Sequence, residues 1–223
     1  MVPPVFNPLM PVIELIFTVV AVLFCFLIYF KTRESYELTK HNGIKHFRDA
    51  FLFFGLSYVV RFLFSLVMFS RFAFDFIMPR ELFGPLFILP LGYFSTMGIF
   101  YLIFSSVWKR FSNKAMLIIG HVTAIVLSVV SFITRSHIIL LILQSVFLII
   151  AVILSFTAQK GVKKLTQAKI LYILVAALWL INLWIIDRGG RRPPFLPFME
   201  IIFHLISLAV FVIIYYKVSK WVK

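Results

Sequence analysis

Five polar or ionisable residues lie near the predicted outer ends of long apolar segments of this 223-residue chain: Glu14, Arg61, Asn182, Glu200 and His204. A charged group at the centre of a lipid bilayer costs about 2.5 to 3.5 kcal/mol on insertion scales, so such a residue indicates a functional or structural requirement. A guanidinium presents a planar fork of N–H donors that matches carboxylates and phosphates. Grouped with the other four residues, Arg61 could bind a small anionic or zwitterionic ligand.

Helical spacing brings these residues onto consistent faces. Residues three or four apart share one face of a helix, which pairs Glu200 with His204 and Tyr58 with Arg61. Counted inward at about 1.5 Å per residue, the five residues named at the outset all fall in the outer half of the bilayer. We therefore predict one ligand-binding pocket, formed by Arg61, Glu14, Glu200, His204, Asn182, Tyr58 and Trp179.

Two alternatives use the same residues. Arg61 paired with Glu14 or Glu200 could lock the helices together, since a buried ion pair can serve specificity. Glu200 and His204 also have the spacing of two metal ligands on one helix face. A catalytic zinc site needs a third protein ligand, and Glu14 is the candidate at similar depth. We predict no bound metal, no cofactor and no catalytic residue, and the ligand and ion-pair hypotheses both stay open.

The elements that must position these residues are segments long enough to cross a membrane. The chain is 62% hydrophobic and 13% charged, about half the charged fraction of a soluble domain. About 20 apolar residues cross a hydrocarbon core of roughly 30 Å. We predict an all-α, polytopic membrane protein, a seven-transmembrane-helix bundle forming a single transmembrane domain over 1–223. Its predicted spans are 11–30, 47–70, 82–108, 115–134, 138–158, 170–186 and 198–216.

The net charge of +14 is distributed unevenly between the two faces of this predicted bundle. Fifteen lysines and arginines fall on the face that holds the C-terminus, six fall on the opposite face, and Arg61 lies within the second span. Positive residues in short loops stay cytoplasmic. We therefore expect the N-terminus outside, the C-terminus in the cytoplasm and a location in the cell membrane. The basic inner face should attract anionic lipid headgroups, and no nucleic-acid partner is expected.

The segment 31–46 is the most distinctive polar stretch and is predicted to be an inner loop with a turn at Asn42 and Gly43. Its simplest interpretation is a solvated connector whose apolar residues touch the membrane interface. The alternative is a docking surface for a cytoplasmic protein, with Tyr36, His41 and Lys45 as contact residues.

The third predicted span contains Gly84, Pro85, Pro90, Gly92 and Gly98, so we expect it to be kinked or locally unwound. Such breaks persist in a bilayer where neighbouring helices satisfy the freed carbonyl groups, which predicts a position inside the bundle. The segment 187–194 could be a surface turn or a lid over the outer end.

Seven spans with an outer N-terminus resemble rhodopsins and G-protein-coupled receptors in architecture alone. The residues do not follow either family, because the last span has no lysine between Phe198 and Tyr216 to hold retinal. It also lacks the Asn-Pro-x-x-Tyr motif of the receptors.

The function predicted from these features is a receptor-like, multi-pass membrane binding or sensor module, not an enzyme, which signals to a separate cytoplasmic partner. A small-solute transporter is the alternative, suggested by the broken third span. A less favoured alternative is an intramembrane metal-dependent hydrolase built on Glu200 and His204.

Overall fold

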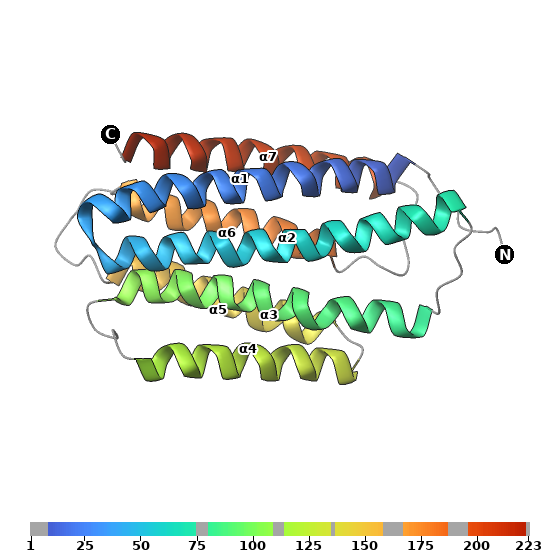
Figure 1. The fold of residues 1–223 in the computed structure, drawn as a ribbon, viewed down its shortest axis with the longest axis horizontal. Helices are drawn as coiled ribbons and strands as arrows, with labels where there is room; N and C mark the ends of the chain where they lie inside the picture. Colours follow the sequence, from blue (N-terminus) through green and yellow to red (C-terminus); the bar gives the residue numbers. More distant parts are fainter. Residues whose placement is uncertain are drawn as a thin grey trace.

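The computed structural model describes residues 9–74, 80–108, 114–134, 137–157, 167–186 and 196–221. Within these ranges the chain forms seven helices that run side by side along the long axis of the molecule (Figure 1). They are α1 (Leu9–Thr39), α2 (Asn42–Phe74), α3 (Arg80–Val107), α4 (Lys114–Thr134), α5 (His137–Thr157), α6 (Gln167–Ile186) and α7 (Leu196–Trp221). The predicted all-helical fold is confirmed.

The helices have the length and composition of membrane spans. Among the described residues, α1 to α5 and α7 are long and apolar enough to cross a bilayer, and α6 contributes a shorter apolar stretch, Lys169–Leu183. Large aliphatic side chains such as Ile118, Ile142 and Ile153 are more than half exposed on the outer surface. Such exposure suits contact with lipid tails. The chain is a multi-pass membrane protein.

Six of the helices close into a ring. Each of α1, α2, α3, α5, α6 and α7 contacts the next in that order, and α7 returns to α1. Helix α4 stands outside this six-helix ring, at the edge of the bundle beside α3 (Figure 1). Its buried face consists of small residues, Gly120, Ala124, Ser128 and Ser131. Small residues allow close helix approach in membranes, so α4 packs against the bundle with one face only.

Aromatic side chains fill the centre of the six-helix ring. Trp179 of α6 stacks on Phe54 of α2 with ring centroids 4.5 Å apart, and Tyr58 contacts both Trp179 and Phe211. Gly98 of α3 lies so close to Phe54 that an added Cβ would be 2.5 Å from the phenyl ring. The middle of the ring is therefore packed with side chains and forms no wide channel.

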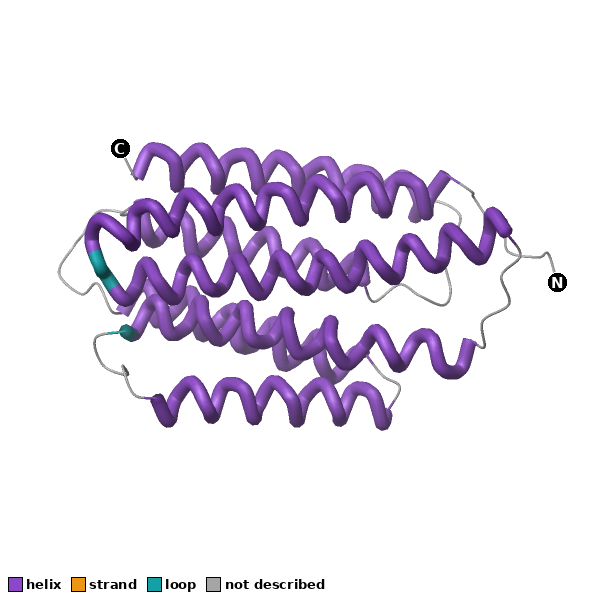
Figure 2. Tube along the Cα trace, in the orientation of Figure 1, coloured by secondary structure: helices purple, strands orange, loops and turns teal. Residues whose placement is uncertain are grey.

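The predicted inner loop 31–46 is wrong, because almost all of it is helical. Helix α1 continues to Thr39 and α2 begins at Asn42, which leaves a turn of two residues, Lys40 and His41 (Figure 2). Lys40 has a left-handed φ of 52° and its N–H donates to the carbonyl of Tyr36 at 2.8 Å, as in a helix C-terminal motif. The reversal thus lies two residues before the expected Asn42 and Gly43.

Charge pairs explain why the helix persists through this polar segment. Arg33 and Glu37 form an i,i+4 ion pair at 2.7 Å, and Lys31 pairs with Glu34. Such pairs stabilise an exposed helix by a few tenths of a kcal/mol each. At about 1.5 Å per residue, the 31 residues of α1 span about 46 Å, more than a hydrocarbon core of roughly 30 Å. The two helices therefore extend beyond the core as a hairpin, the α1–α2 hairpin.

The expected local unwinding of the third span is also wrong, whereas the expected kink stays a prediction. Helix α3 is continuous from Arg80 to Val107 through Pro85 and Pro90. It contacts α2, α4 and α5, and this close packing on several sides explains why the loss of individual backbone hydrogen bonds is tolerated. The segment 187–194, considered above as a turn or a lid, lies outside the described residues.

Candidate functional site

The polar residues predicted from depth and helical phase lie near one end of the bundle, opposite the α1–α2 hairpin. Arg61 lies on the face of α2 that also carries Ser57, Tyr58 and Ser65, and all four residues are buried. A helical period places these side chains on the face that α2 turns toward its neighbours. The polar face of α2 is therefore enclosed by other helices and separated from lipid.

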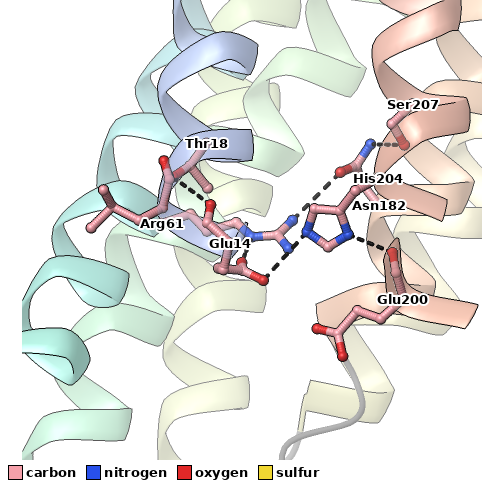
Figure 3. Close-up of polar contacts among 8 residues, drawn as sticks. Glu14, Thr18, Arg61, Asn182, Glu200, His204 and Ser207 are labelled. Atoms are coloured by element: carbon pink, nitrogen blue, oxygen red, sulfur yellow. Dashed lines mark hydrogen bonds and ion pairs between the residues drawn. The ribbon is translucent and has the colours of Figure 1, made fainter. Parts of the chain in front are cut away.

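Arg61 joins α2 to two other helices. Its Nε donates to Oε1 of Glu14 on α1 at 2.6 Å, and its Nη1 donates to Oδ1 of Asn182 on α6 at 3.4 Å (Figure 3). Arg61 is 7% exposed. Charge-assisted hydrogen bonds of this kind are the stronger ones in proteins, and a buried guanidinium requires them.

Asn182 extends the network to α7. Its Nδ2 donates to the carbonyl of Leu178 at 2.7 Å and to Oγ of Ser207 at 3.4 Å. The amide therefore uses its oxygen toward Arg61 and its nitrogen toward α6 and α7. Because it is 1% exposed, water cannot readily replace these partners.

His204 of α7 approaches the same carboxylate from the other side. Its Nδ1 donates to the backbone carbonyl of Glu200 at 2.7 Å, and its Nε2 lies 3.5 Å from Oε2 of Glu14. The edge of the imidazole meets the ring of Phe17, with centroids 4.2 Å apart. The Arg61 guanidinium carbon lies 5.5 Å from the centre of the same phenyl ring, so Phe17 contacts both basic side chains.

Glu14 is the centre of this arrangement, which we name the Arg61 cluster: Glu14, Arg61, Asn182 and His204. One carboxylate faces a guanidinium of α2 and an imidazole of α7, and the amide of α6 completes the set. The Glu14 side chain is 22% exposed, more than those of Arg61 and His204. Four helices thus meet through polar contacts, and Glu14 is the most accessible of the three ionisable members.

The other residues of the predicted pocket have different positions. The backbone carbonyl of Glu200 takes part through His204, whereas its side chain projects away from the imidazole (Figure 3). Tyr58 and Trp179 belong to the aromatic centre of the six-helix ring, with their ring centroids 5.7 Å apart. Tyr58 also meets Phe17 edge-on. The cluster therefore has an aromatic neighbour layer, and its polar contacts join Glu14, Arg61, Asn182 and His204.

Gln144 is a polar residue that the sequence analysis did not single out. Its Nε2 donates to Ser95 at 2.6 Å and to Thr96 at 3.0 Å, which ties α5 to α3. With Ser95 and Trp179 it lines a cavity of about 20 Å³, room for about one water molecule. The sequence does contain a signal for this site, because Gln144 is the one amide side chain in the apolar span 138–158.

At the opposite end of the bundle, the three proposed docking residues lie on the α1–α2 hairpin. The guanidinium carbon of Arg48 lies 5.3 Å from the ring centre of Tyr36. The rings of His41 and Trp108 meet edge-on, with their centroids 4.4 Å apart. Lys45 is exposed. These contacts fix the shape of the hairpin end, which remains accessible to water.

Within the described residues, the structure provides no third ligand for the metal-site alternative. In the part of the chain that the structure describes, no group of three His, Cys, Asp or Glu side chains lies close enough to hold a metal ion. His204 already commits Nδ1 to the carbonyl of Glu200. Nothing in this geometry favours the metal-dependent hydrolase.

Comparison with known proteins gives one informative similarity. The chain is 31% identical over 234 aligned positions to an uncharacterized protein of Archaeoglobus fulgidus, and the alignment covers 99% of each chain. No protein-family model matches the sequence. No solved structure matches it either.

The position of Asn182 generates a stability prediction. We expect Asn182→Leu to lower the thermal stability of the purified protein, because Arg61 and Ser207 lose a buried partner. Leaving a buried polar group unpaired costs about 1 to 3 kcal/mol. The measurement is thermal unfolding in detergent. Asn42→Leu, at an exposed position at the start of α2, is the control and should change little. Equal stability of Asn182→Leu and wild type would contradict the proposed role of the amide.

Proposed function

We propose that this chain functions as a membrane binding or sensor module. It belongs to the same family as the uncharacterized protein of Archaeoglobus fulgidus. The observation that carries this proposal is the position of Glu14 between Arg61 and His204. The Glu14 carboxylate accepts a hydrogen bond from the Arg61 guanidinium, as the anionic group of a ligand would. A small anionic or zwitterionic compound that displaces it would gain the same fork of N–H donors.

Displacement of Glu14 would alter contacts between helices. Glu14 is the member of the cluster on α1, so a ligand that takes its place at Arg61 weakens the tie of α1 to α2. A ligand shifts a conformational equilibrium only by its differential affinity for the two states. Exchange of an internal carboxylate for an external anion supplies such a difference.

Continuous helices provide the route from this site to the other end of the bundle. Glu14 and Tyr36 belong to the single helix α1, and Arg61 and Lys45 belong to the single helix α2. At about 1.5 Å per residue, Glu14 and Tyr36 are about 33 Å apart along the axis. A shift of either helix near Arg61 would move the hairpin that carries Tyr36, His41 and Lys45. We propose this hairpin as the surface that contacts a separate cytoplasmic protein.

Transport is less favoured by this geometry. The small-solute transporter was suggested by a broken third span, and α3 is continuous. The aromatic side chains at the centre of the six-helix ring also leave little space, as the cavity of about 20 Å³ illustrates.

The orientation is part of the proposal. We place the chain in the cell membrane with the Arg61 cluster toward the outside and the basic α1–α2 hairpin toward the cytoplasm and its anionic headgroups. The support is the excess of lysine and arginine on the hairpin side.

A thermal-shift screen of small anionic and zwitterionic compounds tests the function. A compound that binds at Arg61 should raise the melting temperature of the wild-type protein. The effect should disappear in Arg61→Met and persist in Arg48→Met, which removes an arginine at the hairpin end. Glu14→Gln should bind the same compound more tightly, because the competing carboxylate is gone. If no compound acts through Arg61, the proposed function is wrong.

Cysteine labelling tests the orientation. Cys25 is the one cysteine of the chain, so a Cys25→Ser background can carry either Leu38→Cys on the hairpin or Met199→Cys near the start of α7. A membrane-impermeant maleimide applied to intact cells should label the cysteine at 199 and should reach that at 38 only after the cells are opened. The reverse pattern would contradict the orientation.

A further inference from the structure

We propose that Glu14 and His204 bind one proton between them, so that the Arg61 cluster is a proton site as well as an anion site. This inference rests on the proposed function for its physiological role, but the proton can be measured without any ligand.

The imidazole of His204 carries a hydrogen atom on Nδ1. Nδ1 of His204 lies 2.7 Å from the backbone carbonyl of Glu200. A carbonyl oxygen can only accept, so Nδ1 must carry a hydrogen atom. A neutral imidazole has one such hydrogen. If His204 were neutral, Nε2 would therefore present a lone pair.

The lone pair on Nε2 of a neutral His204 would face the carboxylate of Glu14. Nε2 is buried and lies 3.5 Å from Oε2 of Glu14. An ionised carboxylate is also acceptor-only. Two acceptors that face each other repel, and the burial of Nε2 limits the screening of this repulsion by water. One proton on either Nε2 or Oε2 converts this contact into a hydrogen bond.

Charges on the neighbouring elements are compatible with this proton. Arg61 and Tyr58 of α2 interact electrostatically with Glu14, Glu200 of α7 interacts with Arg61, and α6 contributes the neutral Asn182. Arg61 and an ionised Glu14 cancel. With the proton on His204, the cluster carries one net positive charge, and the Glu200 carboxylate lies on the same helix one turn away.

The proton gives the cluster a way to release Arg61. If it moves from Nε2 of His204 to Oε2 of Glu14, one N–H bond breaks and one O–H bond forms. The ring becomes neutral with its hydrogen on Nδ1, and the carboxyl becomes neutral. Arg61 then loses the carboxylate of Glu14 as its charged hydrogen-bond partner and can bind an external anion in its place. Proton position and anion binding are thereby linked at a single carboxyl group.

NMR spectroscopy of the full chain with ¹⁵N-labelled histidine tests this proposal. The chain has five histidines, so variants that replace His41, His46, His121 and His137 with Gln, one at a time, assign the His204 signals by elimination. At pH 7 we expect either both ring nitrogens of His204 protonated or an infrared carboxylic-acid band that Glu14→Gln removes. Where the wild-type protein has the proton on Nε2, that proton should be lost in Glu14→Gln. His121→Gln, which removes a histidine bonded to Tyr93 at 2.9 Å, is the control and should leave the His204 signals unchanged.

The outcomes separate the proton from the ligand. An unprotonated Nε2 together with an ionised Glu14 at pH 7 would overturn the proton site, whatever the ligand screen finds. A protonated pair without any anion that acts through Arg61 would support the proton site and overturn the proposed function. The elimination variants keep the test valid even if a His204→Gln protein fails to fold.

Discussion

Arg61 is a guanidinium within an apolar membrane span, and the arrangement of the surrounding helices depends on compensating its charge. The side chain can neither lose its proton nor reach bulk water, so partners must come from other helices. Glu14 and Asn182 satisfy this requirement, which brings α1 and α6 toward α2 at one end of the bundle. His204 adds α7 through the same carboxylate. The polar contacts that stabilise the bundle at this end also form its candidate site.

Much of this arrangement could be predicted from the sequence, because a helix has a fixed period and a bilayer has a fixed thickness. Depth and phase singled out Glu14, Arg61, Asn182 and His204, which the structure brings together. The α1–α2 turn was misplaced because polar residues in 31–46 were read as loop. The i,i+3 pair of Lys31 with Glu34 and the i,i+4 pair of Arg33 with Glu37 favour helix up to the left-handed Lys40, where the chain reverses.

Other features depend on tertiary contacts that one sequence does not encode in a readable form. The role of Gln144 emerges only when α5 meets Ser95 and Thr96 of α3, because its hydrogen-bond partners lie 48 or 49 residues away in the sequence. Tyr58 and Trp179 were predicted to line the ligand pocket, but whether an aromatic residue lines a pocket or fills a core depends on its neighbours. Here they fill the centre of the six-helix ring.

The central claim is that Glu14 and Arg61 act as a pair. A double-mutant cycle of Glu14→Gln, Arg61→Met and the double variant, read by unfolding in detergent, measures it directly. Removal of either partner leaves a buried group uncompensated, whereas removal of both does not. The account predicts a coupling free energy of about 1 to 3 kcal/mol, with the double variant more stable than the sum of the single effects implies. Additivity within about 0.5 kcal/mol would contradict it.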